Sequence, residues 1–279
     1  MVKVVTDSGS DLPPQLAQEL GINVVPLNLH FDIETYRDNV DIDTEEFYRR
    51  LAGDKVFPTT SAPAPGIFVE LFTKLAEETD EILTIPLSSK LSATYESAIE
   101  AKNLVKANCR IEVIDSMMII GAQMLLVIKA AKAAQSGANL KAISDMVRKD
   151  VPRTHVRMAF DTLEYLRRGG RIGKGQAFLG DLLKLNPILG INDGEVAPIA
   201  RTRSWPQAVD FLVNFAKGFS EIEGMAVEDA TTPDELEVLA DRISELFPEK
   251  PMYRSKVSPV VGAHVGPHVL AVSILGDRA

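Results

Sequence analysis

Hydrophobic residues along the first half of the chain follow two kinds of spacing. Short β-branched runs, such as residues 81–85, are typical of buried strands, whereas the apolar residues of 66–79 recur every three or four positions, as on one helix face. This reasoning predicts strands at 3–6, 22–31, 81–85 and 111–115, and helices at 11–21, 43–53, 66–79, 92–105, 117–137 and 139–151. Strands and helices that alternate in this way give a parallel sheet with helices on both faces.

The pattern is less regular in the second half of the chain. A hairpin is predicted over 187–200, because its Asp193-Gly194 pair is a strong two-residue turn between apolar runs. The other predicted elements are strands at 155–160, 224–229 and 268–275, and helices at 162–170, 176–185, 204–219 and 233–247. More antiparallel pairing indicates an α+β layer. We therefore predict an α/β protein of two domains, with a Rossmann-like parallel sheet in residues 1–152 and a layered α+β domain in residues 153–279.

Composition narrows the class of protein. The 279 residues are 46% hydrophobic and 25% charged, which supplies enough apolar material for a packed core. A formal net charge of -9 argues against a broad nucleic-acid surface, since such a surface needs a basic face. The single cysteine, Cys109, allows no internal disulfide and fits a reducing compartment. With no signal-peptide pattern, and with its longest apolar run (117–131) shorter than the ~20 residues of a membrane span, the chain is predicted to be cytoplasmic.

Familiar catalytic and metal-binding motifs do not fit this sequence. Residues 169–175 look like a phosphate-binding loop, but they lack the glycine spacing and the hydroxyl of a Walker motif. His264 and His268 are four residues apart, yet the Gly-Pro pair between them prevents one helix from presenting both to a metal. No pair of acidic residues is marked as an acid/base couple. We therefore expect no catalytic residue, no metal and no cofactor.

Turns rich in hydroxyl groups follow several predicted strands, at residues 6–11, 57–66 and 86–98. Ligands of parallel sheets bind at the carboxyl ends of the strands, where the unpaired N–H groups of helix starts favour an anion. Ser92 stands where a helix N-cap would stand, so these hydroxyls either cap helices or also hold an anion. No histidine lies near Ser92 in the sequence to activate it as a nucleophile. Neutral donors also suit a ligand with one modest charge better than a polyphosphate.

Seven segments give the chain a resemblance to a known family over essentially its full length. They are VTDSGSDLP (5–13), FPTTSAPAPG (57–66), LSSKLSATYESA (87–98), IDS (114–116), DTLEYLRRGGRIGKGQAFLGDLLKLNPIL (161–189), DGEVAPIARTR (193–203) and GAHVGP (262–267). Their order and spacing resemble those of the DegV family, and the run over 161–189 is the most specific of them.

The resemblance implies a two-domain α/β protein that binds one long-chain fatty acid, such as palmitate, stearate or oleate, between its domains. In bacteria with a fatty acid kinase, such proteins hold the fatty acid while the kinase phosphorylates its carboxylate, so this kinase is the implied protein partner. By motif, the carboxylate contacts are implied to be Thr59, Ser92 and His264. The resemblance also implies that Arg171 lies near the mouth of the site and that Arg201 acts together with the kinase.

The implied tunnel needs an apolar lining, and the sequence departs from the family pattern at two positions beside it. Residues 117–128 and 178–183 are either tunnel lining or ordinary core. Ala93 replaces a usual Gly, but the first turn of a helix does not need the conformational freedom of Gly. His268 also replaces a Gly, which leaves open whether it or His264 points inward; we expect His264.

Two other functions compete with that of a lipid-binding subunit. One is a stand-alone hydrolase or transferase acting on a small carboxylate or phosphate, which the missing base, metal and nucleotide motifs disfavour. The other is a structural or regulatory partner that senses lipid. A non-catalytic fatty-acid-binding protein agrees both with the residues and with the resemblance.

Overall fold

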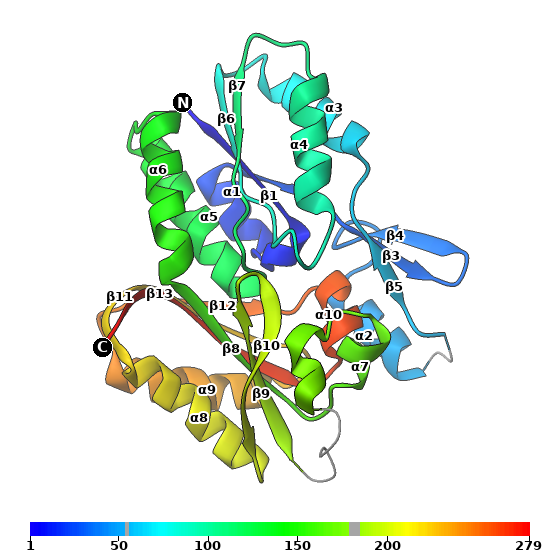
Figure 1. The fold of residues 1–279 in the computed structure, drawn as a ribbon, viewed down its shortest axis with the longest axis vertical. Helices are drawn as coiled ribbons and strands as arrows, with labels where there is room; N and C mark the ends of the chain where they lie inside the picture. The colour runs from blue at the N-terminus through cyan, green and yellow to red at the C-terminus, as the bar shows by residue number, and fades with distance from the viewer. Residues whose placement is uncertain (54–55, 179–184) are drawn as a thin grey trace.

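The computed structural model describes residues 1–53, 56–178 and 185–279, and Figure 1 gives the arrangement of their helices and strands. Within these residues the first half forms a parallel sheet. Its spatial order is β2 (Ile22–Val25), β1 (Lys3–Asp7), β6 (Glu81–Thr84) and β7 (Arg110–Val113). The parallel sheet predicted from the alternation of strands and helices is therefore confirmed.

Helices cover both faces of this parallel sheet. Val4 and Val5 are neighbours in β1 and point to opposite faces, as successive strand residues do. Val4 belongs to a core formed with α1 (Pro14–Leu20), α5 (Ile120–Gln135) and α6 (Leu140–Asp150). Val5 belongs to a core formed with α3 (Pro65–Leu75) and α4 (Thr94–Leu104).

A second, mixed sheet dominates the other half of the molecule. Its spatial order is β10 (Glu195–Thr202), β9 (Asn186–Asn192), β8 (Thr154–Phe160), β13 (Val269–Arg278), β11 (Phe219–Asp229) and β12 (Met252–Lys256). Only β11 and β12 pair in parallel among these neighbours in the described chain. The hairpin turn at Asp193-Gly194 is confirmed, with φ of 51° and 79°, the positive values that such a turn requires.

The second sheet is covered on one face by α8 (Trp205–Lys217) and α9 (Pro233–Leu246), and on the other by α5. This confirms the layered α+β half. Helix α5 therefore lies between the two sheets, as Figure 1 shows. Every residue from Ile120 to Ile128 is buried, because the two sheets cover this largely apolar stretch from both sides.

Shorter elements gather where the two halves meet. A small antiparallel sheet places β3 (Asn28–Phe31) between β4 (Glu34–Arg37) and β5 (Thr59–Ser61). Beside it lie α2 (Thr44–Gly53), α7 (Glu164–Arg168) and α10 (Pro259–Val265), with α10 packed between the other two (Figure 1). The sequence patterns did not predict β4, β5, β12 or α10. The 3₁₀ turns are η1 (Ser8–Ser10), η2 (Val151–Arg153) and η3 (Gly173–Phe178).

The helix predicted over 176–185 is only partly described. Residues up to Phe178 form the 3₁₀ turn η3 rather than an α-helix, and Leu179, Leu182 and Leu183 lie outside the described residues. Phe178 packs against the core cluster that the two halves share.

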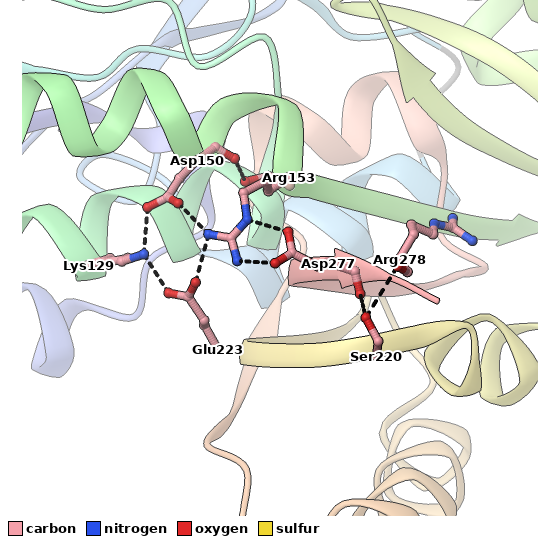
Figure 2. A network of polar contacts seen from close by, with 8 residues as sticks. Lys129, Asp150, Arg153, Ser220, Glu223, Asp277 and Arg278 are labelled. Atoms are coloured by element: carbon pink, nitrogen blue, oxygen red, sulfur yellow. Dashed lines mark hydrogen bonds and ion pairs between the residues drawn. The ribbon is translucent and has the colours of Figure 1, made fainter.

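An ion-pair network joins α5, the η2 turn and the second sheet (Figure 2). Lys129 of α5 lies 2.6 Å from Asp150 and 2.5 Å from Glu223 of β11. Arg153 lies 2.7 Å from both of these acids and 2.6 Å from Asp277 of β13. Charges shared in a network hold geometry better than isolated surface pairs do. The domain boundary after residue 152 falls inside this network and stays a prediction.

The close contact between α5 and the second sheet gives a stability test. A Cβ on Gly121 would lie 2.6 Å from Glu228 Oε2 and 2.8 Å from the Cβ of Ala226, and the Gly121 N–H now donates to Glu228 Oε2 at 2.9 Å. We expect Gly121→Ala to lower the free energy of unfolding by about 1–3 kcal/mol through overpacking, as measured by urea denaturation. In Gly66→Ala, the matched control on α3, the new Cβ meets nothing within 4 Å. The control is expected to be neutral or stabilising by up to ~1 kcal/mol. Equal effects of the two substitutions would contradict the contact.

Candidate functional site

A cavity lies where the carboxyl ends of β1 and β6 approach the second sheet. Its volume is about 60 Å³, and its walls come from both halves of the chain. Most of the lining is apolar: Leu27, Leu87, Leu91, Ile119, Ile120, Met158, Phe160, Leu166, Ile191, Val196, Val260, Val261 and Val265. Ile119 and Ile120 stand at the start of the central helix α5, so this helix supplies part of the wall. The arrangement is typical of a site for an apolar ligand.

The polar side chains of the lining each have their own hydrogen-bond partners. Thr60 Oγ1 and His264 Nε2 are 2.7 Å apart and share a hydrogen bond. Arg171 donates from Nε to the Leu91 carbonyl at 3.2 Å and from Nη1 to the Gly169 carbonyl at 2.9 Å. Ser92 follows Leu91 directly. Three hydroxyls (Thr60, Ser61 and Ser92), one imidazole and one guanidinium thus stand in an otherwise apolar lining.

His264 is held closely and carries no charge near neutral pH. Burial lowers its pKa to about 4, and the positive charge of Arg171 lowers the pKa in the same direction. Its Nδ1 is buried, has no hydrogen-bond partner among the described residues and faces Gly169, where an added Cβ would overlap the ring. Glycine at 169 therefore makes room for this imidazole. A neutral ring offers one donor and one acceptor to its surroundings.

Three of the five site residues implied by the sequence line the cavity: Ser92, Arg171 and His264. Thr59 does not. It is exposed and pairs with His30 across the small sheet, whereas its neighbour Thr60 lines the cavity. Because successive strand residues face opposite sides, a shift of one position moves the hydroxyl from the cavity to solvent. The threonine of the cavity is therefore Thr60, and this corrects the earlier expectation.

Two further residues lie away from the cavity lining. Arg201, on β10, donates from Nη2 to the Ala177 carbonyl at 3.2 Å, and its guanidinium lies 4.3 Å from the centre of the Phe178 ring. His268 hydrogen-bonds to Glu235 at 3.1 Å and packs on Trp205, with the ring centres 4.0 Å apart and the planes tilted by 40°. His264 is thus the histidine that lines the cavity, as expected.

The helix cap predicted at Ser92 is wrong. Helix α4 begins at Thr94, its N-cap position is Ala93, and no side chain caps it. The Ser92 hydroxyl instead pairs with Thr94 Oγ1 at 2.9 Å. The turn before it is fixed by Ser88, whose buried hydroxyl donates to the Gly194 carbonyl of the β9–β10 hairpin at 2.8 Å. The sequence did not predict the contact of Ser88 with Gly194 or that of Gly169 with His264, because each joins segments that are distant in the chain.

The hydrogen bonds of the Ser92 hydroxyl and the His264 ring show how these two groups are paired. Among the described residues, the hydrogen bond of the His264 ring runs to Thr60 and that of the Ser92 hydroxyl to Thr94, so no serine–histidine pair is formed. Across the described ranges, no group of three or more His, Cys, Asp or Glu could hold a metal ion. No helix in the described part of the chain is both long and apolar enough to cross a membrane.

The chain is similar to known proteins along its whole length. The family model described as "Uncharacterised protein, DegV family" matches residues 1–277. A DegV domain-containing protein of Caldanaerobacter subterraneus is 38% identical over 275 residues, which cover 97% of each chain. The solved structure "Fatty Acid Binding of a DegV family Protein from Thermus thermophilus" matches with a TM-score of 0.90 and 31% identity over 99% of both chains. The structure of DegV, "a fatty acid binding protein from Bacillus subtilis", matches with a TM-score of 0.89 and 30% identity over 98% of this chain and 99% of that one.

The low pKa of His264 predicts a specific pH dependence of stability. In the unfolded chain this imidazole titrates near 6.5, whereas in the fold its pKa is about 4, so protonation favours unfolding. The contribution is complete above pH 6.5 and is lost as the pH falls toward 4. We expect His264→Gln to reduce the loss of unfolding free energy between pH 7 and pH 5 by on the order of 1–2 kcal/mol.

His155 supplies a control for this measurement. It packs on Phe219 outside the cavity, and burial lowers its pKa to about 4 as well. His155→Gln should also reduce the loss of unfolding free energy between pH 7 and pH 5. The double variant should show the sum of the two reductions, because the two rings share no partner. Urea denaturation at each pH measures these effects. A pH slope unchanged by His264→Gln would contradict the buried, neutral state of that ring.

Proposed function

The chain belongs to the DegV family, and from this premise we propose that it binds one long-chain fatty acid in the cavity, with the carboxylate at the polar end. The observation that carries the proposal is the placement of Thr60, Ser92 and His264 in one largely apolar lining, beside Arg171. The relatives described as fatty-acid-binding proteins, which share this fold at 30% and 31% identity, support it.

The polar end matches the needs of a carboxylate. A carboxylate accepts hydrogen bonds at two oxygens, and hydroxyls and a neutral imidazole can each donate one. When the His264 Nε2–H donates to Thr60 Oγ1 across their 2.7 Å contact, the Thr60 hydroxyl proton can point at a ligand, so the pair supplies one donor while the imidazole keeps its partner. The guanidinium of Arg171, held by two carbonyls, adds a positive potential. A ligand with one negative charge costs less to remove from water than a polyphosphate, so it fits these hydroxyls, imidazole and guanidinium better.

The apolar wall supplies the larger share of the affinity. Burial of about sixteen carbons at ~0.8 kcal/mol per CH₂ gives a gross gain on the order of 10 kcal/mol, which exceeds much of the cost of association. The cavity of about 60 Å³ is smaller than such a chain, so lining side chains must move aside on binding. Met158 is suited to this movement, because a thioether chain repacks easily.

The proposed role is non-catalytic and needs no cofactor of its own. The bound fatty acid, for instance palmitate, stearate or oleate, would present its carboxylate to a fatty acid kinase in a host that has one. Arg201 lies outside the cavity lining, over Phe178 of η3, which supports a role in work with that partner rather than in holding the ligand. That the protein is cytoplasmic also stays a prediction.

The proposal predicts that the protein takes up palmitate and that two adjacent threonines differ in their effect. Thr60→Val should weaken palmitate binding by about 1.5–3 kcal/mol, the value of a hydrogen bond to a charged group. Thr59→Val, the matched control on the other face of β5, should leave the affinity unchanged. Calorimetric titration of delipidated protein measures both. A protein that contains no lipid after purification and takes up neither palmitate nor oleate would refute fatty-acid binding.

A second prediction concerns the partner. Arg201→Ala should keep the palmitate affinity of the unchanged protein but lower the rate of acyl phosphate formation at least tenfold in a mixture with a fatty acid kinase and ATP, in line with loss of a charged contact at an interface. Arg203→Ala, an exposed arginine two residues away on the same segment, is the control and should leave the rate unchanged. If Arg201→Ala mainly abolishes palmitate binding, the assignment of Arg201 to the partner is wrong.

A further inference from the structure

Helix α10 belongs to the second half of the chain, but the first half holds its start. The Ser258 N–H donates to Asp11 Oδ1 at 3.2 Å, and the Val260 N–H donates to Asp38 Oδ1 at 3.2 Å. Pro259, between them, has no N–H. Ser258, the N-cap residue, makes no side-chain cap of its own. The backbone donors that a helix start leaves unpaired are thus satisfied by two carboxyl groups more than 200 residues away in the sequence.

Both carboxyl groups are buried, which is costly unless they make specific contacts. Asp11 and Asp38 are 6% and 1% exposed. Burial raises the pKa of Asp38 to about 7, and burial together with the nearby Glu228 carboxyl raises the pKa of Asp11 well above its usual value. Asp11 sits in a left-handed turn with φ of 50°, and the Asp38 N–H donates to the Leu27 carbonyl at 2.9 Å. The backbone conformation at Asp11 and the backbone hydrogen bond of Asp38 therefore help to orient the two carboxyl groups.

The helix that they hold carries much of the proposed ligand site. Val260, Val261, His264 and Val265 all line the cavity. Val260 and His264 are four residues apart, so they lie on the same face of the helix. In a helix of seven residues, a shift of the first turn is passed on to His264.

Helix α10 packs tightly against α2, so its position relative to α2 is fixed. A Cβ on Gly262 would lie 2.6 Å from both Phe47 Cε1 and the Tyr48 hydroxyl, so α10 meets α2 with no space to spare. That same hydroxyl donates to the Val257 carbonyl at 3.2 Å, just before the helix. Asp11, Asp38 and Tyr48 thus hold one end of α10, while Thr60 holds His264 near the other.

We infer that Asp11 and Asp38 are positioning residues of the fatty-acid site, which hold the first turn of α10 so that His264 meets Thr60 and the ligand carboxylate. The inference rests on the proposed function for its ligand, but the placement of the His264 ring can be measured without any ligand. Neither carboxyl group lines the cavity, so each acts through the helix rather than on the fatty acid.

The experiment compares Asp38→Ala with Asp38→Asn in the full chain. Asparagine keeps an oxygen that can accept from the Val260 N–H, whereas alanine removes it. We expect Asp38→Ala to weaken palmitate binding about tenfold or more, as loss of a buried hydrogen bond would, and Asp38→Asn to retain most of the affinity. The ¹⁵N and ¹H signals of the His264 ring in the ligand-free protein should shift in Asp38→Ala and stay near their original positions in Asp38→Asn.

Two controls separate positioning from general destabilisation. Asp150→Ala removes another buried carboxylate, from the network in Figure 2, and should lower stability without moving the His264 signals. In a His264→Gln background, Asp38→Ala should cost much less palmitate affinity than it does alone, because its effect passes through the ring. Should Asp38→Ala fail to fold, Asp38→Ser serves instead, since its shorter side chain cannot reach the same amide.

The outcomes separate this inference from the proposed function. A wild-type protein that does not bind palmitate refutes the function, and the His264 signals then decide the positioning role alone. Unshifted His264 signals in folded Asp38→Ala overturn the positioning role, even where palmitate binds. Equal losses in Asp38→Ala and Asp38→Asn, or the same loss with and without His264, overturn it as well.

Discussion

The burial of α5 between two sheets is the constraint on which the rest of the structure depends. From Ile120 to Ile128 the helix has no exposed side, so it can exist in water only when both sheets cover it. The first-half sheet packs on it from one side and the second-half sheet from the other. This brings the two halves of the chain together at a fixed spacing. It also puts the start of the helix, at Ile119 and Ile120, in the wall of the cavity.

Polar groups in this interface set the orientation of α5, which apolar packing alone would leave less specific. Gln123 is fully buried and donates to Thr6 Oγ1 at 3.0 Å and to the Ile85 carbonyl at 3.2 Å. Asp7, whose pKa burial raises to about 7, accepts from the Leu87 N–H at 2.8 Å and from the Gly9 N–H at 2.9 Å. Each contact joins the helix or a strand end to the turns that border the cavity. A rotated helix would leave the Gln123 amide buried without these partners, and a buried unpaired amide costs more than a hydrogen bond gains.

Regular elements could be predicted from the sequence because their spacing is local, whereas the site could be predicted only in part. The parallel sheet, the hairpin at Asp193-Gly194 and the buried α5 all follow from periodicity and turn chemistry. The phase of β5 does not, because a strand of three residues is too short for alternation to show which threonine faces inward. Helix α10 was missed for a related reason. Its apolar, β-branched sequence resembles a strand, and the carboxyl groups that stabilise its start come from Asp11 and Asp38.

The two ends of the cavity therefore differ in what holds them. Strands β8, β9 and β10 and the start of α5 supply part of the apolar wall, and these elements are held by the large sheets and their cores. The polar end is built from a turn, a three-residue strand and a seven-residue helix, none of which is stable alone. Their hydroxyls and imidazole come together only after the halves have closed on α5, since Thr60 and His264 are 204 residues apart in the sequence. Under the proposed function, the apolar wall would repack around acyl chains of different length, while the long-range contacts keep the geometry at the polar end fixed.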